Sequence, residues 1–243
     1  MDRTSPPDRR VPAGQPVVTW GLGDFCWVYF GGLIAGLVLA TFGYGLTGDK
    51  PAHPGTITDG LSFLGQFGGW IALLVFVSRR KGLGSLRADF GLVVHRRELW
   101  IVAVGVVLEI ALSVLIFPIT NLVHQSQDVV KDLDQARGVH LVLIALVAGL
   151  VAPVCEEVLF RGLLLRALRR RVSPSAAVAI SALVFALAHP MLDPTWGTFA
   201  VVPALFALGA ISGVAALRRG DLSVSILLHI GFNLLTTVSA FHK

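Results

Sequence analysis

The strongest constraint on the fold of this chain is a series of seven long apolar segments separated by short polar stretches. Each approaches the length of about 20 apolar residues that a helix needs to cross the hydrocarbon core of a bilayer. The sequence therefore predicts an all-α fold, a polytopic transmembrane helical bundle of about seven membrane-spanning helices, with no room for a soluble domain. The segments run from Phe25 to Leu46, Leu61 to Ser78, Leu99 to Val123, Val139 to Leu165, Ser173 to His189, Thr198 to Leu217 and Leu222 to Phe241.

Composition and charge agree with a membrane protein. Of the 243 residues, 54% are hydrophobic and only 14% are charged, which is too little polar surface for a water-soluble domain. We expect a multi-pass protein of the cell membrane. The positive-inside rule, applied to the distribution of Lys and Arg given below, predicts that its N-terminus is cytoplasmic. Basic loops suit anionic headgroups, so we expect the lipid bilayer as a partner and no nucleic acid. All but four of the 20 Lys and Arg residues fall on one side of the predicted spans, and the exceptions are Lys50, Lys131, Arg137 and Lys243.

The N-terminal residues 1–18 form a separate segment. They carry four prolines among Arg and Asp, which excludes the apolar core of a signal peptide. We expect a flexible cytoplasmic tail here, followed by the N-terminal transmembrane helices over residues 19–138.

Charged and amide side chains inside the predicted spans are few, and such groups are costly in a bilayer and usually retained for function. Glu157 precedes Arg161 by four residues, in the orientation that favours a salt bridge on one helix face, so we expect this pair to have a structural, positioning role. Glu156 is rotated by about 100° around the same helix and is left free to act as a general base. The set comprises Glu109, Glu156, Glu157, Arg161, His189, His229 and Asn233.

Counting along two consecutive helices places Glu156 and His189 at one depth. The fourth and fifth segments form a predicted hairpin whose turn lies near residues 171–173. At about 1.5 Å per residue, both side chains lie roughly 22 to 24 Å from that turn. We therefore expect them to meet, with His229 and Asn233 following one helical turn apart on the last segment.

These residues stand in four motifs, and together the motifs resemble the CPBP family of intramembrane proteases, which includes the CAAX prenyl endopeptidases and the bacterial Abi proteins. The resemblance implies a catalytic transmembrane core over residues 139–241. The motifs are Glu156-Glu157-Val158-Leu159-Phe160-Arg161-Gly162, Phe185-Ala-Leu-Ala-His189, Phe206-Ala-Leu-Gly209-Ala-Ile-Ser-Gly213 and His229-Ile-Gly-Phe-Asn233.

The resemblance also implies catalytic roles. Glu156 would activate a water molecule with help from His189, and His229 with Asn233 would stabilise the oxyanion of a tetrahedral intermediate, which needs donors placed in advance. The implied activity is an intramembrane endopeptidase that hydrolyses peptide bonds of membrane-associated peptides or proteins. Gly209 and Gly213 form a small-x-x-x-small face that allows close helix packing.

A metal site is the alternative mechanism. Glu156, His189 and His229 make a set of two histidines and one glutamate that is able to hold Zn²⁺ and leave a position for water. The chain has no His-Glu-x-x-His helix, and the metal would leave no obvious separate carboxylate as base. We therefore expect glutamate-activated water and no cofactor.

Two other classes of function compete with the protease. A non-catalytic membrane scaffold, for example a bacteriocin-immunity protein of the same fold, would not require Glu156, His189, His229 and Asn233, which are all present. A transporter using intramembrane carboxylates as a proton relay is less consistent with polar groups that gather in the last four segments. The sequence does not indicate the oligomeric state, the physiological substrate or the role of Glu109.

Overall fold

The computed structural model describes residues 18–51, 53–123, 128–192 and 194–242, and the predicted tail therefore lies almost wholly outside the described residues. Within these ranges the regular structure is helical, which confirms the all-α fold. The elements are α1 (Leu22–Thr47), α2 (Thr56–Phe63), η1 (Leu64–Gly68), α3 (Gly69–Lys81), α4 (Leu86–Phe90), η2 (Arg96–Glu98), α5 (Ile101–Val123), α6 (Asp128–Gln135), α7 (Gly138–Leu146), η3 (Val147–Val151), α8 (Ala152–Glu157), η4 (Val158–Leu165), α9 (Arg166–Arg169), α10 (Pro174–Leu192), α11 (Trp196–Arg219), α12 (Ser223–Ser239) and η5 (Ala240–His242).

Six helical stretches in the described ranges are long and apolar enough to cross a membrane. They are 22–47, 56–81, 96–122, 138–169, 174–192 and 196–219. The seventh predicted span corresponds to α12, whose 17 residues extend roughly 26 Å, slightly less than the hydrocarbon thickness of about 30 Å. The polytopic bundle is thus confirmed, with one helix shorter than the sequence suggested.

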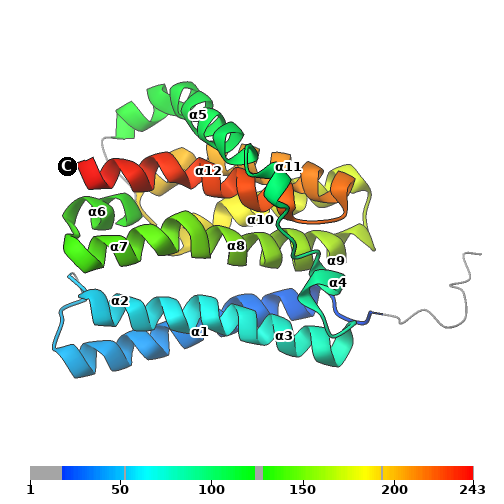
Figure 1. Ribbon diagram of the computed structural model, residues 1–243, viewed down its shortest axis with the longest axis horizontal. Helices are drawn as coiled ribbons and strands as arrows, with labels where there is room; N and C mark the ends of the chain where they lie inside the picture. Colours follow the sequence, from blue (N-terminus) through cyan, green and yellow to red (C-terminus); the bar gives the residue numbers. More distant parts are fainter. Residues whose placement is uncertain (1–17, 52, 124–127, 193, 243) are drawn as a thin grey trace, which may run out of the picture.

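Most helices run roughly along the long axis of the molecule, and α5 crosses them obliquely, as Figure 1 shows. The antiparallel pair of α1 with α2 and α3 lies on one side of the continuous helix α7 to α9, and α12 and α5 lie on the other side. α12 packs against α5, α11, η3 and α8, so its polar side chains face the inside of the bundle. This position explains why a helix shorter than the bilayer is accommodated there.

Glycines allow the closest helix contacts around α12. A Cβ at Gly231 would lie 2.0 Å from the carbonyl oxygen of Val102, and one at Gly105 would lie 2.2 Å from that of Leu228. Both distances are far below van der Waals contact, so α5 and α12 touch through their backbones. The predicted small face of α11 is also used, because Gly209 lies against Ala182 of α10.

The helix that carries the two glutamates is not a regular α-helix. It runs without a break from Gly138 to Arg169, over 32 residues, or roughly 48 Å, and so extends beyond the hydrocarbon core of about 30 Å. The π-helical segments η3 and η4 interrupt it on either side of α8. Such segments insert extra residues into a helical turn and often lie at functional sites.

Asp89 joins three segments at one end of the bundle. Its carboxylate accepts hydrogen bonds from the Trp20 indole N–H at 3.1 Å, the Ser78 hydroxyl at 2.6 Å and the Leu83 backbone N–H at 2.9 Å. Burial alone would raise the pKa of this carboxyl, but the hydrogen bonds outweigh burial and hold its pKa below the usual value. The ionised form of Asp89 therefore stabilises the fold.

We predict that Asp89→Asn lowers the free energy of unfolding at pH 7 by about 2 kcal/mol, because donors that now meet a buried charge would meet a neutral amide. The lowered pKa means that the stabilisation is present above the unfolded-state pKa of about 3.9 and is lost as pH falls through the folded-state value. Tryptophan-fluorescence melting in detergent should show that Asp89→Asn is less stable than the wild type at pH 7. Below about pH 4 the difference in stability between the two proteins should be smaller. A deficit that is the same at every pH would contradict this account.

Candidate active site

Glu156 and Glu157 are the last two residues of α8, between the two π-helical segments. They lie on different sides of one helix, as their adjacent positions require. The Glu157 side chain is completely buried, whereas that of Glu156 retains 17% of its exposed area. Two identical carboxylates thus occupy two different environments.

Glu157 is bound by partners from two helices. Its Oε1 accepts a hydrogen bond from Nδ1 of His229 on α12 at 3.0 Å, and the same oxygen lies 3.2 Å from Nη1 of Arg161 on η4. The ion pair expected between Glu157 and Arg161 is therefore present. The contact with His229 is additional and was not anticipated from the sequence.

Arg161 is held in a narrow, fully buried space. Its guanidinium lies over the ring of Phe185 at 4.2 Å from the centroid, an arrangement that stabilises a cation. A Cβ at Gly209 would lie 3.1 Å from Nη2 of Arg161, so Gly209 leaves room for the guanidinium as well as for helix packing. Nε, Nη1 and Nη2 form no hydrogen bond within the described ranges, and the charge depends on Glu157 and the aromatic ring.

Glu156 faces the other nitrogen of the same imidazole. Its Oε2 lies 3.8 Å from Nε2 of His229, which is beyond hydrogen-bonding distance. The described residues provide no hydrogen bond to the Glu156 carboxylate. His229 therefore lies between one carboxylate that it contacts by a hydrogen bond and one that forms no hydrogen bond within the described residues.

His189 approaches this cluster through an aromatic ring. Its Nδ1–H donates a hydrogen bond to the carbonyl of Phe185 one turn earlier, at 3.0 Å, which leaves Nε2 as the unprotonated nitrogen of a neutral ring. Phe185 makes edge contacts with both imidazoles, with centroids 5.0 Å from His189 and 5.6 Å from His229. No hydrogen bond or ion pair joins His189 directly to Glu156 among the residues described.

Asn233 lies one helical turn beyond His229, as predicted. Its Nδ2 donates to the carbonyl of Ala148 at 2.8 Å, so the amide is oriented by the π-helical segment η3. One amide hydrogen remains for another acceptor. Glu109, the carboxylate without an assigned role, accepts a hydrogen bond from Thr236 of α12 at 2.9 Å; neither an arginine nor a histidine is bonded to it in the described ranges.

The three side chains of the alternative zinc site do not form a compact ligand set. A tetrahedral zinc ion needs its donor atoms about 2.0 to 2.2 Å away and therefore close to one another. The described residues contain no group of three or more His, Cys, Asp or Glu side chains that could hold a metal ion. Of the proposed ligands, Glu156 and His229 approach each other, with Oε2 and Nε2 3.8 Å apart.

Phe185 lies at the centre of the candidate site, although its place in a motif with His189 gave it no predicted role. It is fully buried. It also contacts Arg161, His189 and His229 through one ring. Its spacing of four residues from His189 was the available signal, because this spacing places both rings on one face of α10.

The segment that carries these side chains is similar to known proteins. A family model described as type II CAAX prenyl endopeptidase Rce1-like matches residues 138–235. An "Uncharacterized 24.3 kDa protein" of Escherichia coli is 33% identical over 92 residues, which cover 37% of this chain and 41% of that relative. No solved structure matches the chain.

The matched residues include Glu156, Glu157, His189, His229 and Asn233, and Phe185 contacts the rings of both histidines. The family match thus covers the same helices as the four sequence motifs. The match over residues 138–235 supports the CAAX-protease-like family that the motifs predicted.

Proposed function

We propose that this protein is an intramembrane endopeptidase that hydrolyses peptide bonds of membrane-associated substrates, with Glu156 as the base that activates water. The observation that carries the proposal is the contrast between the two adjacent glutamates. Glu157 is buried and bound to His229 and Arg161, whereas Glu156 is partly exposed, forms no hydrogen bond with the described residues and faces the other nitrogen of His229. Only the free carboxylate has capacity to accept a proton from water.

The proposed reaction begins with a water molecule near Glu156 and His189. Glu156 takes one proton as the water oxygen attacks the substrate carbonyl carbon, and the carbonyl oxygen becomes an oxyanion. Nε2 of His189 accepts a hydrogen bond from the water, because Nδ1 carries the ring proton toward Phe185. The C–N bond then breaks, and the proton held by Glu156 passes to the leaving amine.

His229 and Asn233 are the proposed donors to the oxyanion. Glu157 accepts the Nδ1 proton of His229 and so orients the ring, and an Nε2–H on the same ring is the proposed donor to the oxyanion. Asn233 has one amide hydrogen bonded to Ala148 and one left for the substrate. Both donors lie on one face of α12, where they require little rearrangement during the reaction.

The family description and the site together suggest a first substrate. The matched family is named for prenyl endopeptidases that act on CAAX sequences, so we propose a peptide with a lipid-modified cysteine near its C-terminus. The orientation with a cytoplasmic N-terminus and residence in the cell membrane remain part of the proposal. A non-catalytic scaffold would not explain why Glu156, beside His229, forms no hydrogen bond with the described residues.

We predict that Glu156→Gln abolishes cleavage while the protein stays folded. The amide keeps the shape of the side chain but accepts no proton at neutral pH, and loss of a general base costs about 10²- to 10⁴-fold in rate. A fluorogenic prenylated CAAX peptide, incubated with purified protein in detergent, measures the rate. Activity equal to that of the wild type would remove Glu156 from the mechanism.

Glu157→Gln is the matched variant on the neighbouring residue, and it should chiefly affect stability. Removing one partner of a fully buried ion pair costs about 3 to 5 kcal/mol, because Arg161 would keep its charge with no counter-ion. Glu156→Gln should change stability by less than about 1 kcal/mol. Melting temperatures of the two variants in the same detergent compare these costs, and equal losses would contradict the assignment of one bound and one free glutamate.

Removal of metal distinguishes the two mechanisms. Glutamate-activated water predicts a cleavage rate that stays within about twofold of the untreated rate after incubation with a strong chelator. A zinc mechanism predicts a loss of activity that added Zn²⁺ reverses. The same purified protein and peptide serve both measurements, and recovery with Zn²⁺ would replace Glu156 as base by a metal-bound water.

A further inference from the structure

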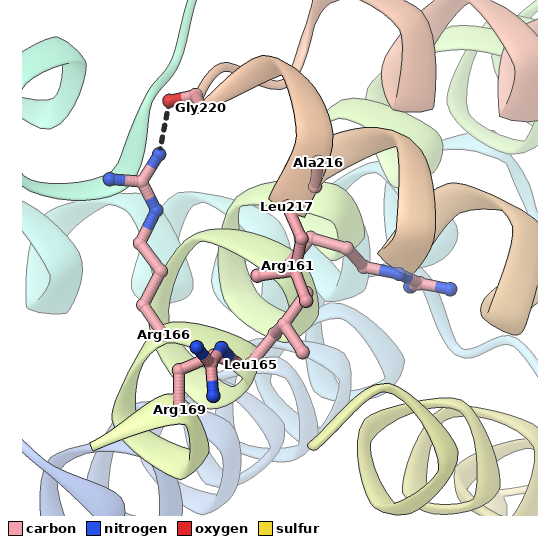
Figure 2. Close-up of a pocket in the computed structure, with 7 residues that line it drawn as sticks. All are labelled: Arg161, Leu165, Arg166, Arg169, Ala216, Leu217 and Gly220. Atoms are coloured by element: carbon pink, nitrogen blue, oxygen red, sulfur yellow. Dashed lines mark hydrogen bonds between the residues drawn. The ribbon is translucent and has the colours of Figure 1, made fainter. Parts of the chain in front are cut away.

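A second site lies at the end of the bundle, away from the two glutamates. A cavity of about 380 Å³ is lined by Arg161, Leu165, Arg166, Arg169, Ala216, Leu217 and Gly220, and we name it the arginine pocket. It lies between the last turns of the helix α7 to α9 and the end of α11, as Figure 2 shows. Its volume is within the range of pockets that bind small ligands.

The residues that line the arginine pocket include basic side chains and no acidic ones. Three of its seven residues are arginines, and none is Asp or Glu. Figure 2 shows the Arg161 guanidinium turned away from the other two, toward Glu157 in the candidate active site. Arg166 and Arg169 are therefore the cations that the pocket offers to a ligand.

Both of these arginines have N–H donors that the hydrogen bonds among the described residues do not use. Arg166 donates one hydrogen bond to the carbonyl of Asp89 and one to that of Gly220, and Arg169 donates one to the carbonyl of Val172. A guanidinium has five N–H donors, so several remain on each. Within the described ranges neither forms an ion pair with a carboxylate.

The acidic side chains whose charges act on Arg166 have other partners. They are Asp89 and Asp221, and neither lines the pocket. Asp89 is bound by Trp20, Ser78 and Leu83, and Asp221 lies 3.4 Å from the His95 ring. The positive charge inside the pocket is therefore not neutralised by a group that lines it.

The position of the arginine pocket matches the depth of lipid headgroups. Arg169 ends the candidate span 138–169, and Arg219 ends the candidate span 196–219. Leu165, Ala216 and Leu217 supply an apolar wall beside the arginines. A basic recess with an apolar side, at the end of two spans, has the polarity of a phospholipid, in which a charged phosphate adjoins apolar chains.

We propose that the arginine pocket binds the phosphate group of an anionic phospholipid. Arg166 and Arg169 donate charge-assisted hydrogen bonds to the phosphate oxygens, a geometry for which guanidinium groups are well suited. Leu217, which is partly exposed, contacts the glycerol and the first methylenes of the acyl chains. The site rests on no catalytic role for Glu156, and its test requires no substrate.

The test is native mass spectrometry of the full-length protein with phosphatidylglycerol or phosphatidylcholine added in detergent. We expect phosphatidylglycerol to bind more tightly, and Arg169→Gln to weaken its binding about tenfold through loss of charge-assisted hydrogen bonds. Arg79→Gln is the matched control, because Arg79 is an exposed basic residue at the end of α3 that does not line the pocket. This control should bind the lipid like the wild type.

Further measurements distinguish a lipid phosphate from free inorganic phosphate as the ligand. Inorganic phosphate at millimolar concentration should compete poorly, because it lacks the apolar contacts. Phosphate binding that depends on Arg169 without phosphatidylglycerol binding would overturn the lipid assignment. Equal weakening by Arg79→Gln and Arg169→Gln, or equal affinity for the two lipids, would also overturn it.

A second variant covers the case in which Arg169→Gln fails to fold. Leu217→Trp keeps every charge and fills the cavity with a larger side chain. We expect it to weaken phosphatidylglycerol binding by a similar factor while its melting temperature shows a folded protein. Unchanged lipid binding in folded Leu217→Trp would show that the lipid does not occupy the arginine pocket.

Discussion

The interaction on which the rest of this structure depends is the buried ion pair of Glu157 with Arg161. Neither side chain is exposed, and an uncompensated charge at such a position is strongly destabilising. Because Glu157 also receives the Nδ1 hydrogen bond of His229, the requirement to neutralise Arg161 fixes the imidazole as well. The guanidinium lies over Phe185, so one charge links η4, α10 and α12 around the candidate active site.

Helix packing without large side chains makes this arrangement possible. Gly231 lies between His229 and Asn233 on α12, and it allows the backbone of α5 to approach so closely that a Cβ would meet the Val102 carbonyl at 2.0 Å. In α11, Gly209 makes room for the Arg161 guanidinium. Apolar surface has little tendency to drive helices together inside lipid, so close backbone packing and buried polar contacts determine how α12 is rotated.

The sequence predicted the fold well and the site in part. Hydropathy locates the spans because the bilayer sets their length, and the four-residue spacings place Glu157 beside Arg161 and Asn233 beside His229. It did not predict the contact of Glu157 with His229, because periodicity fixes which residues share a face of one helix but not how two helices are rotated against each other. The π-helical segment η3 receives a tertiary hydrogen bond from Asn233 at Ala148, a contact that local sequence does not indicate.

The separation of the two glutamates has a consequence for how a base can work inside a membrane. A single carboxylate that both neutralised Arg161 and accepted a proton from water would leave the arginine unpaired during each catalytic cycle. With Glu157 bound to the cation and Glu156 left beside Nε2 of His229, Glu156 can change its protonation while the ion pair stays intact. In the proposed mechanism, the doubled glutamate would thereby allow proton transfer without the repeated cost of leaving a buried charge unpaired.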